Sequence, residues 1–343
     1  MTEKILLEAK ADVSKYVDKK LVNEALDDLA VQSTAFIKKI DALTNLTAAE
    51  KSTLKTLLEA DADLAKAFAK APEEMAGAWK LVRSSIAEGT QFAKDPKTLE
   101  KLGEMMQTNS SFRQKLGSSW EQELKEILEK NADLRCGTCG NKGISSLPAM
   151  DEVLDNLAQI SRFSDKPGFS SVLKNLKSNV ANRDGVNHMI SYIKKNADEF
   201  ENITEFEFQY AYEFLNKADV LVGNIKYEFK SWTPDLPNPW NSFFGGTGNS
   251  YTQFVRYLQN TTDVKNLKYI FNGAKASESQ VKSAFKALLT NKKTEVFEAN
   301  PNLWKQFDRI GGGKIRNLTD FENLLNHSTF DINHPIFNFI KSQ

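Results

Sequence analysis

Hydrophobic residues in the first third of the chain recur at the spacing of one helix face. Leu21, Leu26 and Leu29 form one such stripe, and charged residues lie between them. Thr47–Glu50 has the Ser/Thr-x-x-Glu pattern of a capping box, which marks the start of a helix. Strand-like alternation is not convincing anywhere in this segment. The pattern therefore predicts a helical bundle over residues 1–135.

A break in this pattern follows at residues 136–146, which are rich in glycine and serine. Cys136 and Cys139 form a C-x-x-C pair there, which could be half of a zinc site, a redox pair or a tight turn. No second such pair exists and the three histidines lie far away in sequence. We interpret this segment as a connector, with a disulfide-locked turn as the alternative. Helical periodicity then resumes over residues 147–202 and predicts a helical bridge to the segment that begins at residue 203.

The next segment, residues 205–216, is rich in aromatic residues. Phe206, Tyr210 and Phe214 gather on one face if it is helical, and we expect a helix. Glu207 would then lie within the apolar face, where an unpaired carboxylate is costly. The interpretations that stay open are a metal ligand, an ion pair with a buried lysine or arginine, and a partly exposed helix.

Two short runs of strand-forming residues follow, Asp219–Val222 and Ile225–Ser231. Gly223 and Asn224 separate them, and two residues of this type between two strands predict a tight hairpin. In the second run, strand alternation places Glu228 and Lys230 on one face. The hairpin then brings Asp219 alongside that pair. Two carboxylates and one ammonium among apolar neighbours indicate a site for a divalent metal ion.

Downstream of the hairpin the predicted elements alternate between helix and strand. Residues 251–259 form a helix on which Gln253 and Tyr257 are neighbours, although its apolar stripe lies on nearly the opposite side. Residues 267–272 and 294–299 are expected to be strands. The predicted fold class is α+β, with an all-helical N-terminal region and a C-terminal α/β domain over residues 203–343 whose mixed sheet is flanked by helices.

The combination of Asp219, the Glu228-x-Lys230 strand and the Gln253/Tyr257 helix resembles the PD-(D/E)xK, or restriction-endonuclease-like, nuclease superfamily. The resemblance covers roughly residues 203–300. It implies a restriction-endonuclease-like domain that binds Mg²⁺ or Mn²⁺ through Asp219 and Glu228, hard oxygen ligands that suit these ions. Glu207 would add a further metal ligand.

The same resemblance implies a role for each remaining residue of the motif. Lys230 would orient the attacking water and neutralise charge on the phosphate. Gln253 would complete the catalytic set of Asp219, Glu228 and Lys230, and Tyr257 would support it. The implied reaction is hydrolysis of phosphodiester bonds in nucleic acid, with DNA favoured over RNA.

The composition of the chain gives little evidence against a nuclease. The chain has 343 residues, is 41% hydrophobic and has a formal net charge of zero, so no global basic field indicates nucleic-acid binding. From Thr233 onward, however, the chain has thirteen lysines and arginines and nine acidic residues, a modest local excess of positive charge. No apolar run approaches the roughly 20 residues that span a bilayer, and the first residues lack a signal-peptide pattern.

A C-terminal nuclease behind a long helical region resembles secreted bacterial effectors of the polymorphic-toxin kind. That resemblance implies delivery by a dedicated system, or as part of a larger toxin, into the cytoplasm of a target bacterium. It also implies a cognate immunity protein, and a secretion-system or carrier partner for the helical region. Two alternatives stay open: a toxin that cleaves tRNA or other RNA on the same fold, and a non-catalytic helical adaptor.

Overall fold

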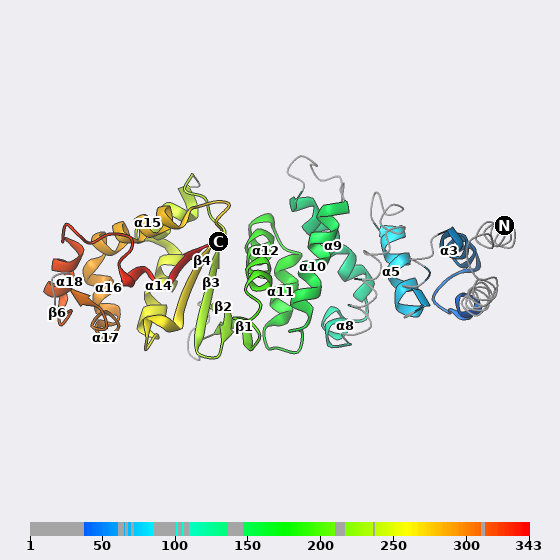
Figure 1. Ribbon diagram of the computed structural model, residues 1–343, viewed down its shortest axis with the longest axis horizontal. Coiled ribbons are helices and arrows are strands. Elements are labelled where there is room, and N and C mark those ends of the chain that lie inside the picture. Colours follow the sequence, from blue (N-terminus) through cyan, green and yellow to red (C-terminus); the bar gives the residue numbers. More distant parts are fainter. Residues whose placement is uncertain are drawn as a thin grey trace, which may run out of the picture. The chain divides into compact units, whose positions relative to one another are not determined.

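The protein is α+β and its chain divides into two compact units, Met1–Ser161 and Arg162–Gln343 (Figure 1). We describe each unit by itself. The computed structural model describes residues 38–60, 65, 68–69, 72–85, 101, 105, 110–135, 147–209, 217–235, 237–309 and 313–343. The predicted helix around Leu26 and the C-x-x-C segment lie outside these residues.

The longer elements described in the first unit are all helices. They are α3 (Ala48–Ala60), α5 (Pro72–Ser85), α8 (Ser110–Leu116), α9 (Trp120–Arg135) and α10 (Leu147–Ser161). The predicted capping box opens α3, because the Thr47 N–H donates to Glu50 Oε2 at 2.8 Å and the Glu50 N–H donates to Thr47 Oγ1 at 3.3 Å. Across the described ranges, no helix has both the length and the apolar character needed to cross a membrane.

The second unit is built on one mixed sheet of five strands in the order β1-β2-β3-β4-β7. The strands are β1 (Ile203–Gln209), β2 (Lys217–Val222), β3 (Ile225–Lys230), β4 (Leu267–Phe271) and β7 (Ile340–Ser342). The first three strands are antiparallel, whereas β3, β4 and β7 run parallel. The connection from β3 to β4 passes through a helix, as parallel pairing requires.

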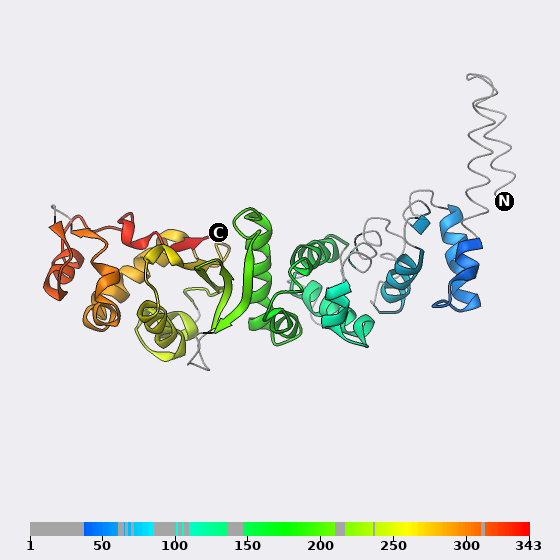
Figure 2. The same ribbon diagram turned by 90° about the horizontal axis from the view of Figure 1, so that it is seen from below.

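Helices cover both faces of this sheet (Figures 1 and 2). On one face lie α11 (Phe169–Leu176) and α12 (Val180–Lys195); on the other lie α14 (Gly248–Gln259) and α15 (Glu278–Asn291). The smaller elements beside them are the π-helical turn at Pro237–Asn241, α13 (Ser242–Phe244), the 3₁₀ turns Val264–Asn266 and Pro335–Phe337, α16 (Lys293–Ala299), α17 (Pro301–Trp304), α18 (Leu318–Leu325) and the small ribbon of β5 (Asp308–Arg309) and β6 (Gly313–Lys314).

Strand alternation divides the residues of β3 between the two faces. Tyr227 and Phe229 point toward α12, where Phe229 packs edge-on against Tyr192 at 5.6 Å between ring centroids. Glu228 and Lys230 point toward α14. Across β4, Tyr269 and Phe271 are paired with Glu228 and Lys230 and join the aromatic core that α14 and α15 close. The predicted division of the strand is thus confirmed.

His188 on α12 is part of the structural core. Its ring is buried against Phe229, and Nε2 lies 3.3 Å from the carbonyl oxygen of Ile270. Burial disfavours the charged imidazolium and lowers the pKa of His188 to about 4. The ring is therefore neutral at physiological pH and contributes packing rather than charge.

The hairpin, the strand at residues 267–271 and the capping box of Ser277 and Gln280 at the start of α15 are confirmed. Gly223 has φ +57°, a conformation that glycine adopts without strain and that the first central position of a type II′ turn requires. These elements depend on local sequence signals, which is why the sequence predicts them.

Two predictions of secondary structure are wrong. The segment from residue 205, expected to be helical, is strand β1 as far as Gln209, because it pairs with β2 and its alternating pattern fits a sheet edge. Residues 294–299, expected to be a strand, belong to helix α16, which packs between α14 and α18. Both are short segments that mix apolar and charged residues, and tertiary pairing rather than local preference decides their conformation.

Candidate active site

The candidate site lies where strands β2 and β3 separate. Their ladder runs from Val222 opposite Ile225 to Val220 opposite Tyr227. At the next position the side chain of Asp219 replaces a backbone partner, and its Oδ2 accepts the N–H of Phe229 at 2.7 Å. The hairpin therefore holds a carboxylate inside the sheet, at the level of the charged residues of β3.

Glu228 and Lys230 form a buried ion pair on β3. Lys230 Nζ donates to Glu228 Oε1, and their side chains are 9% and 3% exposed, respectively. Tyr257 donates its hydroxyl to the second oxygen of Glu228 at 3.0 Å. Lys230 Nζ also donates to Gln253 Oε1 at 3.3 Å. Each charge thus has a neutral partner on α14, and such partners make a buried ion pair tolerable.

Gln253 and Tyr257 reach the site because α14 is buried on more than one side. Its apolar stripe, including Phe254 and Leu258, packs into the core, yet Tyr257 is also fully buried. Gln253 Nε2 donates to Tyr257 Oη at 2.8 Å and to the carbonyl of Lys217 at 3.1 Å, which ties the helix to the start of β2. The structure therefore turns both residues toward the sheet.

Glu207 enters the site from β1 rather than from a helix. The pairs Phe206 opposite Val220 and Phe208 opposite Ala218 flank it, so the register places it across from Asp219. Its φ of 51° is the one positive value among the non-glycine residues described, and such strain is concentrated at functional sites in proteins. Asn175 on α11 donates to Glu207 Oε1 at 3.3 Å.

The site holds more negative than positive charge. Burial, and then the nearby Glu228, raise the pKa of Asp219 well above its usual range, and the opposing influence of Lys230 and of the Phe229 N–H is smaller. Burial also raises the pKa of Glu207, with Lys217 opposing and Glu228 adding to the effect. Burial and the charge of Glu228 thus disfavour the ionised forms of Asp219 and Glu207, and a bound cation would favour those forms.

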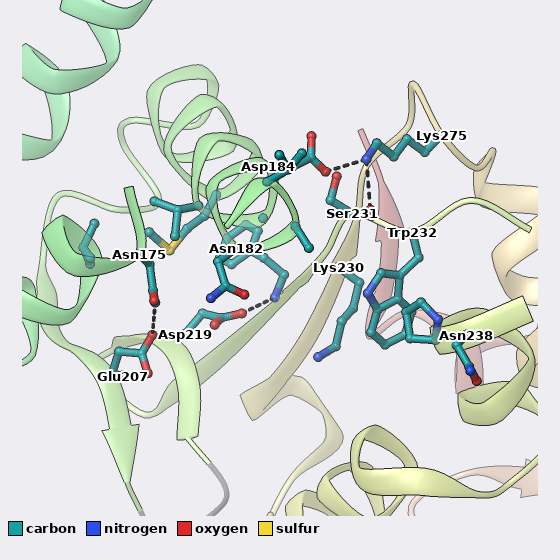
Figure 3. Close-up of a pocket in the computed structure, with 18 residues that line it drawn as sticks. Asn175, Asn182, Asp184, Glu207, Asp219, Lys230, Ser231, Trp232, Asn238 and Lys275 are labelled. Carbon is teal, nitrogen blue, oxygen red and sulfur yellow. Dashed lines mark hydrogen bonds and ion pairs between the residues drawn. The ribbon is translucent and has the colours of Figure 1, made fainter. Parts of the chain in front are cut away.

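A cavity of about 730 Å³ opens beside these residues (Figure 3). Asp219, Glu207 and Lys230 line one wall, and helix α12 contributes much of the opposite wall. An ion pair between Lys275 and Asp184, with Lys275 also bonded to the Ser231 carbonyl, closes part of the rim. Asp219, Glu207 and Lys230 therefore have adjacent space for a ligand.

Sequence reasoning missed the residues that face the carboxylates across this cavity. Asn175, Asn182 and Asp184 come from the helical segment interpreted as a bridge, and Trp232 lies two residues after the end of β3. The run at the start of α12, N-V-A-N-R-D, gave no distinctive signal, because asparagine is common at helix starts and Asn179 serves as the N-cap that accepts the Asn182 N–H.

The donor set suits a hard divalent cation. Carboxylate oxygens are the preferred ligands of Mg²⁺ and Mn²⁺, and Asp219 and Glu207 offer them at the cavity wall. Glu228 is engaged by Lys230 and Tyr257, so metal binding through Glu228 would compete with that ion pair. Within the described ranges, no three side chains of His, Cys, Asp or Glu are already gathered as a ligand set.

Comparisons of the chain with protein-family models, with curated proteins and with solved structures found no match.

Proposed function

We propose that the second unit is a metal-dependent nuclease of the PD-(D/E)xK type that hydrolyses phosphodiester bonds in nucleic acid, with DNA favoured over RNA. One observation carries the proposal: Asp219, Glu228 and Lys230 converge where β2 and β3 separate, with Gln253 and Tyr257 bonded to the charged pair. A sheet of three antiparallel strands continued by a parallel strand through a helix also fits that superfamily.

Each residue of the site has its own role in the proposed reaction. Asp219 and Glu228, with Glu207, would hold Mg²⁺ or Mn²⁺, which supplies Lewis acidity and lowers the pKa of a bound water. Lys230 places an ammonium group beside the carboxylates, where it neutralises charge that develops on the phosphate. Gln253 and Tyr257 fix the positions of Lys230 and Glu228 through the bonds described above.

A nuclease assay on the purified full-length chain tests this function directly. We expect cleavage of single-stranded or duplex DNA, or of RNA, with Mg²⁺ or Mn²⁺ and loss of cleavage with EDTA. Restoring either metal in excess should restore the activity. Failure to cut any of these substrates with either metal would contradict the proposal.

The proposal extends to an antibacterial effector, in which the helical region serves delivery and an immunity protein blocks the site. Expression of the chain in the cytoplasm of a bacterial host should then arrest growth. Glu228→Ala, which removes a proposed metal ligand, should relieve the arrest, whereas Asn323→Ala, at an exposed position on α18, should remain toxic. Normal growth with the intact chain would contradict the effector role.

A further inference from the structure

The cavity beside Asp219 has two ends of different character. Asn175, Asn182 and Glu207 lie at one end, whereas Trp232 and Asn238 lie at the other (Figure 3). The side chain of Lys230 lies between the two ends in this view. A ligand that fills the cavity would therefore meet amide and carboxylate groups, then an ammonium group, then an aromatic ring.

Without a bound cation, the carboxylates of Glu207 and Asp219, which line the polar end, repel a phosphate group there. The same groups accept hydrogen bonds well, and Asn182 adds an amide with both donor and acceptor atoms. Val172 and Met189 supply apolar contacts in the same cavity. This end therefore suits a neutral group that combines flat apolar surface with N–H donors.

The aromatic end is held rigidly beside the proposed catalytic lysine. The ring of Trp232 packs edge-on against Phe243 at 5.6 Å and Phe271 at 6.2 Å between centroids. Lys230 Nζ lies 4.9 Å from the centre of the same ring. An aromatic side chain next to a cation is the combination with which proteins bind single-stranded nucleic acid, through contacts to a base and to the neighbouring phosphate.

We propose that this cavity binds one unpaired nucleobase next to the phosphodiester that is cleaved. The inference rests on the proposed nuclease function. The base enters the polar end, its phosphate lies beside Lys230, and the adjoining nucleotide contacts Trp232. In EDTA, where no cation occupies them, the carboxylates of Glu207 and Asp219 accept hydrogen bonds, and bases with an exocyclic amino group bind better than uracil or thymine. A base paired within a duplex cannot enter, and the substrate is single-stranded or has an extruded nucleotide.

The volume agrees with this occupant. A cavity of about 730 Å³ lies within the roughly 300–1,000 Å³ of typical small-ligand pockets. All the lining residues that the structure describes belong to the second unit.

Binding without cleavage tests the inference. The full chain, kept in EDTA, is titrated with a single-stranded oligonucleotide that carries 2-aminopurine, whose fluorescence falls when the base is enclosed or stacked. We expect quenching by the intact chain. We expect affinity reduced about tenfold or more by Trp232→Ala, because a base–aromatic contact contributes at that level. Asn182→Ala, at an exposed position in the first turn of α12, should weaken binding without loss of folding.

The controls separate this inference from the nuclease proposal. Asn323→Ala changes another exposed helical asparagine, one that does not line the cavity, and should bind as the intact chain does. Trp232→Phe should retain part of the affinity. Quenching without cleavage by any metal would support the base site and contradict the nuclease. Cleavage with equal affinity for duplex and single strands, and with Trp232→Ala and Asn182→Ala unchanged in affinity, would overturn the base site and leave the nuclease standing.

Discussion

Lys230→Met is expected to lower the rate of nucleic-acid cleavage by at least about 100-fold, the level seen when one preorganised electrostatic group is removed from an active site. Methionine retains the length and apolar stem of lysine but has no ammonium group. The variant therefore loses the charge beside Glu228 and Gln253 while most of the packing on β3 is preserved. The measurement is the initial rate of cleavage at saturating Mg²⁺ or Mn²⁺.

This variant needs a control for stability, because Glu228 is only 3% exposed and would be left without its cation. Removing one partner of a buried ion pair typically costs about 3–5 kcal/mol in the free energy of unfolding. The double variant Glu228→Gln/Lys230→Met removes both charges and should recover most of that stability, yet stay inactive. Lys226→Met, on the same strand and bonded to the Asn260 carbonyl, is the matched control and should cut at the rate of the unmodified chain. Cleavage by Lys230→Met within tenfold of the unmodified chain would contradict the proposed role of Lys230.

The hairpin and its charged face could be predicted because they depend on signals only a few residues long. Gly223 sets the turn, and strand periodicity then fixes which face Glu228 and Lys230 share. The α+β class followed from the order of the elements. The contact between Tyr257 and Glu228 could be predicted because it needs only a helix that follows the strand and covers its charged face.

The position of Glu207 could not be predicted from local pattern. Its segment has both helical and strand periodicity, and pairing with β2 decides between them. The role of Asn182 in lining the cavity could not be predicted for a related reason. Helix α12 precedes the sheet in sequence, and only tertiary packing brings its first turn to the cavity. Contacts between distant segments depend on the whole fold, and no short motif encodes them.

Asp219→Asn is expected to abolish cleavage and at the same time to stabilise the protein. Asparagine retains an oxygen that can accept the N–H of Phe229, so the hairpin contact survives. The substitution removes a buried negative charge that lies close to Glu228. Because the folded state disfavours the ionised form of Asp219, removing that charge should raise the free energy of unfolding at pH values where Asp219 is ionised. A gain of stability with loss of function is the behaviour expected of a residue kept for chemistry rather than for folding.

The pH dependence of this gain identifies its cause. The pKa of Asp219 is raised in the folded state, so its ionisation is less favourable there than in the unfolded chain. The folded protein therefore loses stability as pH rises from the ordinary aspartate pKa to the raised pKa of the folded state. Asparagine does not titrate. The difference between the variant and the unmodified chain should therefore be near zero at acidic pH and grow toward alkaline pH, as measured by urea unfolding at several pH values. Asp331→Asn is the matched control, because Asp331 also accepts a backbone N–H but is exposed, and it should give no such trend. A stability gain that is the same at every pH would show that packing, not the buried charge, distinguishes the two side chains at this position.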